Sequence, residues 1–116
     1  TYPEASIFLD LKLHDIPNTV SKTIKSLCSV KPDFINIHAS GGIDMMHAAR
    51  DACDDDIKLL AVTVLTSLKN NDLKTMGTMS ASEAVSHGAS HLVIGRPITQ
   101  ANDPFSAAQQ IIKSVC

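Results

Sequence analysis

The feature that most constrains the fold of this chain is an alternation of short apolar segments with segments whose apolar residues recur at helical spacing. Strands that alternate with helices favour an α/β fold built on a parallel sheet. The run at 57–65 is nearly continuous in apolar residues, which is typical of a parallel strand buried on both faces. The expected strands are residues 7–13, 34–38, 57–65 and 91–94.

Several helix starts can be placed from residues that favour the first turn. Pro17 suits the first position of a helix, where a missing N–H costs nothing. Ser80 and Glu83 have the spacing of a capping box. A last helix is expected to start at Pro104 and to bury an apolar face. That face should consist of residues at helical spacing: Phe105, Ala108, Ile111, Ile112 and Val115.

The alternation fails at one step. Between residues 65 and 91 there are two helical segments, at 72–76 and from Ser80, with no strand between them. The 116 residues correspond to one domain at most. The broken order predicts that a piece of the fold is missing near residues 77 and 78.

Charge and hydropathy narrow the class of function. Ten basic against twelve acidic residues give a net charge of −2, whereas nucleic-acid-binding modules usually present a basic face. No apolar stretch approaches the roughly 18–20 residues of a membrane-spanning helix. The chain starts without a signal-peptide pattern, and its three cysteines form no C-x-x-C. We therefore expect reduced thiols, a cytoplasmic location, and neither a nucleic-acid nor a membrane partner.

Charged residues at the end of the first expected strand suggest a site. Asp10 and Lys12 are two apart and should share one face of the strand, and Asp15 follows in the loop. Sites in parallel α/β proteins lie at the carboxyl ends of the strands. Two carboxylates flanking an ammonium would keep the lysine protonated, as a proton donor beside a fixed negative charge. The alternative is a structural ion pair, with Asp15 placed near a helix N-terminus.

A second candidate site follows the last expected strand. Gly95 would allow a backbone N–H to approach a phosphate closely, and Arg96 offers a two-pronged charged donor. The alternative is a plain turn in which Pro97 ends the strand. A metal site is not expected: His87 and His91 are four apart, but Gly88 and the change to strand interrupt a helical register between them.

The run of residues 10–19 is far more specific than either feature alone. It resembles the signature D-x-K-x-x-D-I-P-N-T of the orotidine 5′-phosphate decarboxylase family. Similarity to this family continues at 38–42, 61–67 and 95–99 and covers nearly the whole chain. The resemblance implies a lyase that converts orotidine 5′-monophosphate to UMP, the last step of de novo pyrimidine synthesis, with no metal or organic cofactor.

The resemblance also implies roles for individual residues. Lys12 would stabilise the carbanion at C6 and deliver the proton that replaces CO2, while Asp10 would lie near the departing carboxylate and hold Lys12. Asp15 and Thr19 would reach across the interface of a homodimer into the partner's active site. Thr66 would line the pyrimidine pocket. By the same resemblance, the glycine and arginine that follow the last strand would hold the 5′-phosphate.

The fold implied by the resemblance is a (β/α)8 TIM barrel, typically of about 250 residues. The four expected strands match the third, fourth, fifth and eighth of that barrel. Residues 1–116 would then be a partial barrel domain, with a segment missing between 77 and 78.

Two other functions stay open. A magnesium-dependent phosphosugar enzyme of the same structural group, such as a hexulose-phosphate synthase or a ketogulonate-phosphate decarboxylase, shares D-x-K-x-x-D, but the continuation at 16–19 favours the orotidylate enzyme. A non-catalytic nucleotide-binding remnant would bind UMP without releasing CO2. Activity in excess chelator discriminates against the magnesium enzyme.

Overall fold

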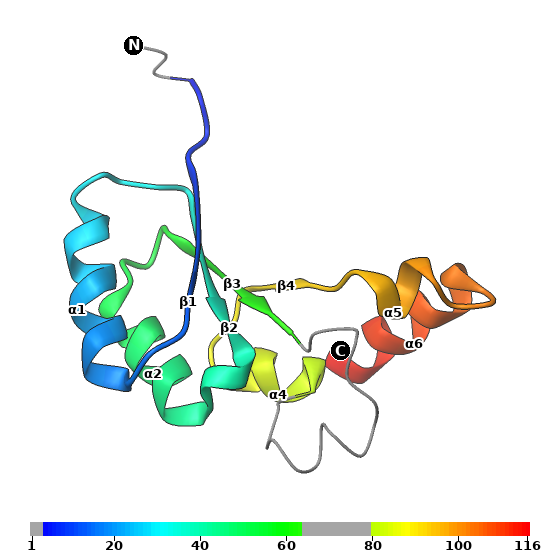
Figure 1. Cartoon of the computed structure of the whole chain (residues 1–116). Helices are drawn as coiled ribbons and strands as arrows, with labels where there is room; N and C mark the ends of the chain where they lie inside the picture. The colour runs from blue at the N-terminus through cyan, green and yellow to red at the C-terminus, as the bar shows by residue number, and fades with distance from the viewer. Residues whose placement is uncertain (1–3, 64–79) are drawn as a thin grey trace.

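Four parallel strands form a single sheet in the computed structural model, which describes residues 4–63 and 80–116. The strands occur in the sheet in their chain order, β1-β2-β3-β4, and all three pairings are parallel (Figure 1). Their bounds are β1 Phe8–Leu13, β2 Phe34–His38, β3 Lys58–Val62 and β4 His91–Val93. The predicted α/β class and parallel sheet are confirmed.

The helices begin where the first-turn residues predict. Helix α1 spans Pro17–Cys28 with its proline in the first turn, and a 3-10 turn at Ala39–Gly41 leads into α2, Ile43–Ala52. Helix α4, Ala81–Ser86, carries the expected capping box: the Ser80 hydroxyl accepts the Glu83 N–H, and the Glu83 carboxylate accepts the Ser80 N–H at 2.8 Å. Because this cap satisfies N–H groups that the helix leaves free, it fixes the start of α4 locally.

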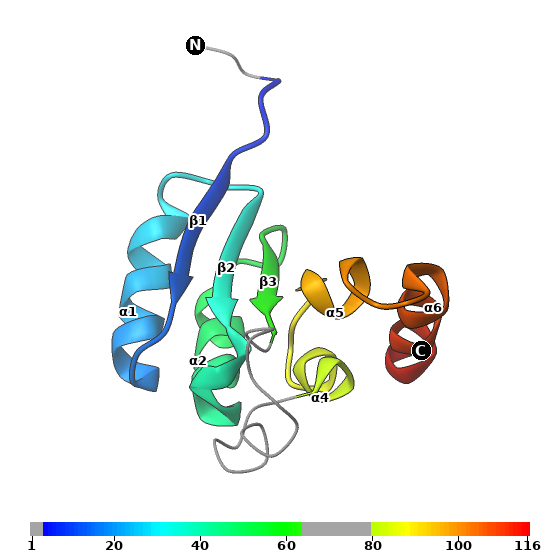
Figure 2. The same cartoon turned by 45° about the vertical axis from the view of Figure 1, so that its right-hand side comes forward.

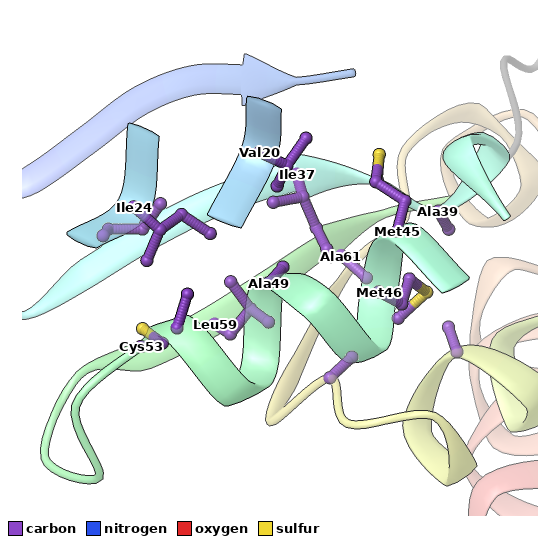
Figure 3. Packing of buried hydrophobic residues seen from close by; sticks show 14 of the residues in the cluster. Val20, Ile24, Ile37, Ala39, Met45, Met46, Ala49, Cys53, Leu59 and Ala61 are labelled. Atoms are coloured by element: carbon purple, nitrogen blue, oxygen red, sulfur yellow. The ribbon is translucent and has the colours of Figure 1, made fainter. Parts of the chain in front are cut away.

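The core lies between one face of the sheet and the helices α1 and α2 (Figures 1 and 3). Alternate residues of β2 and β3 face the helices, as the twofold period of a strand requires. Apolar side chains of both helices fill the space above them, and α1 also packs against α2. The fully buried members are Val20, Ile24, Ile35, Ile37, Ala39, Met45, Met46, Ala49, Leu59, Ala61 and Ala84.

The C-terminal region packs differently from the prediction. Helix α6, Pro104–Val115, has no buried residue, and it contacts α4 and the short helix α5, Arg96–Thr99, which the sequence did not predict. Two members of its predicted inner face, Phe105 and Ile112, are 71% and 58% exposed. The prediction of a buried face is therefore wrong for these residues, because α6 lies to one side of the sheet rather than on it (Figure 2).

Some expectations fall on residues that the structure does not describe. The end of the third strand at 64–65, the helix at 72–76 and the suspected break between 77 and 78 all lie outside the described residues. On the far side of this segment, β4 pairs with β3, so that Ala61 faces Leu92 in the register. The last strand thus occupies the position next to the third.

Candidate functional site

Strand β1 departs from regular pairing at the charged residues. Leu9 pairs with Ile35, but the next pair along is Leu13 with Ile37, so a step of four residues on β1 faces a step of two on β2. This is a bulge, and within it Lys12 has a φ of 49°, in the left-handed region that side chains other than glycine rarely adopt. Bulges of this kind often redirect a side chain next to a site.

The bulge brings Lys12 and Asp10 together. The Lys12 ammonium donates a hydrogen bond to Asp10 Oδ1 at 2.6 Å, and both side chains are exposed to solvent. The bond from Lys12, followed by one from Asn36, lowers the pKa of Asp10 below its ordinary value. The pair is therefore an ionised carboxylate beside an ammonium, at the carboxyl end of a parallel strand.

Asn36 belongs to this cluster, and the sequence analysis missed it. It lies in the middle of β2 and is 2% exposed, and among the described residues it is the only buried polar one. Its Oδ1 accepts the Lys12 backbone N–H at 2.7 Å, and its Nδ2 donates to Asp10 Oδ1 at 2.6 Å. A polar residue between two isoleucines in the middle of the strand was the available signal.

Asp15 and Thr19 lie apart from the ion pair. The Asp15 carboxylate accepts the backbone N–H of Ile16 at 2.7 Å, immediately before α1. Thr19 lies in the first turn of α1, and both side chains are exposed. Within the part of the chain that the structure covers, Lys12 forms an ion pair with Asp10 and none with Asp15. The described residues thus place one carboxylate, that of Asp10, against the Lys12 ammonium.

Two histidines border the same end of the sheet. The rings of His14 and His38 lie 5.4 Å apart, centre to centre, in a tilted arrangement. His38 ends β2, and its partial burial, together with the nearby positive groups His14 and Lys12, lowers its pKa. The neutral form of His38 is therefore favoured close to the ion pair.

Gly95 and Arg96 lie at the other edge of the sheet. They follow β4, whereas the ion pair belongs to β1, and these two strands are the outer ones of the described sheet. Both residues are exposed, and an added Cβ at Gly95 would meet no atom within 4 Å. Their backbone is thus open to a ligand, but the structure does not bring them to the ion pair. Thr66 lies outside the described residues.

Histidines and acids do not gather into a metal centre in residues 4–63 and 80–116, where no group of three or more potential ligands occurs. His87 lies against His47 of α2, with 3.1 Å between their ring nitrogens. None of the helices described has the length and apolar character to cross a membrane.

Comparison with known proteins bears on this arrangement. The sequence model described as "Orotidine 5'-phosphate decarboxylase / HUMPS family" matches residues 3–87. The chain is 33% identical over 174 aligned positions to an orotidine 5'-phosphate decarboxylase of Idiomarina loihiensis, covering 95% of this chain and 75% of the relative. It is 50% identical over 86 residues to the protein of that name from Streptococcus suis, covering 72% of this chain and 37% of the relative.

A solved structure resembles the chain as well. The crystal structure of orotidine 5'-phosphate decarboxylase from Lactobacillus acidophilus superposes with a TM-score of 0.51 at 29% identity, covering 95% of this chain and 75% of the other. The described sheet thus corresponds to part of a (β/α)8 TIM barrel, with four of the eight strands present, as the sequence predicted.

Proposed function

The chain belongs to the orotidine 5′-phosphate decarboxylase / HUMPS family, and we propose that it decarboxylates orotidine 5′-monophosphate to UMP in pyrimidine synthesis. The observation that carries the proposal is the Lys12–Asp10 pair, with 2.6 Å between ammonium nitrogen and carboxylate oxygen. The pair sits at the carboxyl end of a parallel strand, where (β/α)8 enzymes place their chemistry. The names of the relatives agree with this activity.

The chemistry needs a positive charge next to one ring carbon. When the bond from C6 to the carboxylate breaks, CO2 leaves and the electron pair remains on C6, in an orbital that cannot delocalise into the ring carbonyls. A fixed ammonium stabilises this charge electrostatically without reorganising. We propose that Lys12 supplies the charge, transfers a proton from Nζ to C6, and recovers a proton from water. Asp10 holds the ammonium in place.

We propose that this step requires neither a metal ion nor an organic cofactor, because the Lys12 ammonium itself supplies the positive charge. The alternative is a magnesium-dependent phosphosugar enzyme, which the breadth of the matched family keeps in view. The test is release of CO2 from orotidine 5′-monophosphate in excess EDTA. Full activity supports the proposal, and activity that disappears with EDTA and returns with magnesium supports the alternative. UMP binding without CO2 release would indicate a non-catalytic remnant.

We further propose that the active sites are shared in a homodimer. Asp15 and Thr19 are exposed beside α1, and Asp15 makes no ion pair with Lys12 in the described part of the chain. Each could therefore enter the site of a second copy. Mixing Lys12→Ala with Asp15→Ala protein should restore activity, since one site of each mixed dimer then has both residues. No recovery after subunit exchange would contradict shared sites.

Substrate binding is proposed for three further residues. Gly95 and Arg96 would hold the 5′-phosphate, since their exposed backbone and guanidinium suit a phosphate dianion. Thr66 would line the pyrimidine pocket. Binding energy from the phosphate, which does not react, could then organise the reacting end of the substrate.

We propose that residues 1–116 form a partial barrel domain and that a segment is absent between 77 and 78. The alignment with the Idiomarina loihiensis relative spans 174 positions, more than the 116 residues of this chain, so that relative has internal residues without a counterpart here. The intact mass of the protein from its natural source tests this. A mass well above 12.4 kDa supports the proposal, and a mass of 12.4 kDa refutes it.

A cytoplasmic location is also proposed. Cys28, Cys53 and Cys116 are all free thiols in the structure, as expected for a protein kept in a reducing compartment. Non-reducing and reducing electrophoresis of the protein taken directly from cells should agree.

A further inference from the structure

Asn36 is placed where an apolar side chain would be expected. It follows Ile35 and precedes Ile37 in β2, and it is nevertheless 2% exposed. Burying an amide without partners would cost on the order of 1–3 kcal/mol, so its hydrogen bonds account for its presence there. Both of its described side-chain bonds go to the bulge of β1.

The direction of the amide follows from the donors around it. The Lys12 backbone N–H can only donate, so the oxygen of Asn36 must face it, at 2.7 Å. The amide nitrogen then faces Asp10 Oδ1 at 2.6 Å, where it donates. Asn36 thus contacts the backbone of one member of the ion pair and the carboxylate of the other.

This contact has consequences for both charged residues. The Lys12 N–H lies in the bulge, where regular strand pairing is interrupted, and Asn36 gives it an acceptor while the backbone holds a φ of 49°. Asp10 Oδ1 receives donors from both the Lys12 ammonium and the Asn36 amide, which restricts rotation of the carboxylate. A buried residue on the neighbouring strand therefore holds both the Lys12 backbone and the Asp10 carboxylate.

We propose that Asn36 is a positioning residue. Its amide holds the bulge of β1 and the Asp10 carboxylate, so that the Lys12 ammonium is kept in one orientation. The inference rests on the proposed function, since it assigns Asn36 a task in aiming the proton donor. Misplacing a reacting group by about 1 Å can lower a rate by roughly 100-fold. Asn36 does not touch the substrate in this account and acts through Asp10 and Lys12.

Two substitutions separate positioning from simple packing. Asn36→Leu removes both hydrogen bonds at similar volume. Asn36→Asp keeps an acceptor for the Lys12 N–H but replaces the donor with a second carboxylate facing Asp10, so it tests the donor even if the leucine variant folds poorly. Asn102→Leu, at an exposed loop position, is the matched control.

The first measurement is the pKa of the Asp10 carboxyl, followed by carbon-13 NMR in the full-length protein. Loss of the Asn36 donor should raise this pKa in both variants, and more in Asn36→Asp, where like charges face each other. The control should match the wild type. This readout does not depend on catalysis, so it stays informative even if the proposed activity fails.

The second measurement is steady-state decarboxylation as a function of pH. We expect kcat to fall by up to about 100-fold with KM nearly unchanged, and the acid limb of kcat to move to higher pH. A packing role alone would reduce stability without moving that limb. A folded Asn36→Asp protein with the wild-type Asp10 pKa and the wild-type acid limb would overturn the inference.

Discussion

Two isoleucines test where the core of this fold lies. Ile24 on α1 is 0% exposed and belongs to the core cluster, whereas Ile112 on α6 is 58% exposed. Replacing Ile24 with alanine removes three buried carbons, which lowers the free energy of unfolding by about 2.4 kcal/mol at about 0.8 kcal/mol for each carbon. The cavity that remains raises the expected loss in the free energy of unfolding to about 3–4 kcal/mol.

The matched change on α6 should cost little. Ile112→Ala removes the same three carbons from a largely solvated position, and alanine has the higher helix propensity. We expect the free energy of unfolding to change by no more than about 0.5 kcal/mol. The same chemical change thus gives very different results at the two positions.

Urea unfolding followed by helical circular dichroism measures both variants. With a denaturant slope of about 1–3 kcal/mol/M, Ile24→Ala should lower the midpoint by roughly 1–4 M. Ile112→Ala should leave it nearly unchanged. Equal losses in both variants would refute the description of α6 as lying beside the sheet, and would favour the buried face that the sequence pattern predicted.

Three further predictions concern single groups. Ser80→Ala should lower the free energy of unfolding by about 1 kcal/mol in urea titrations, because it removes the cap of α4; no change would show that the cap is not formed. Hydrogen bonds from the Ser80 backbone and side chain lower the pKa of Glu83. The ionised Glu83 carboxylate therefore stabilises the folded protein fully above its ordinary pKa of 4.5, and this contribution is lost as the pH falls through the lowered pKa. As the pH is lowered from roughly 6 to 2, the melting temperature should therefore fall less steeply for Glu83→Gln than for the wild type. Parallel curves of melting temperature against pH would contradict this. Arg96→Ala should weaken UMP binding far more than uridine binding in calorimetry, whereas equal weakening would remove Arg96 from the phosphate site.

Local signals predicted the elements well. Pro17 and Ser80 mark helix starts because a cap or a fixed φ acts within one turn, whatever the rest of the chain does. The strand at 34–38 has the predicted bounds, since its apolar run is bordered by Pro32 and by a turn. The spacing of two along a strand predicts that Lys12 and Asp10 lie together, and they do, although the bulge of β1 rather than a regular strand brings them into contact.

Features that depend on a second element could not be predicted in the same way. The bulge at Lys12 is completed by Asn36, which belongs to another strand 24 residues away. The exposed face of α6 has the period of a buried one, but a period does not say which neighbours a helix meets. Those neighbours are α4 and α5, and they leave Phe105 and Ile112 in solvent.

The most direct test of the account follows the proton at C6. Full-length wild-type and Lys12→Ala proteins are incubated with orotidine 5′-monophosphate in heavy water with excess EDTA, and the UMP formed is analysed by NMR. We expect UMP carrying deuterium at C6 from the wild type, and no turnover above background from a Lys12→Ala protein that remains folded. Substantial decarboxylation by the variant would contradict Lys12 as the proton donor.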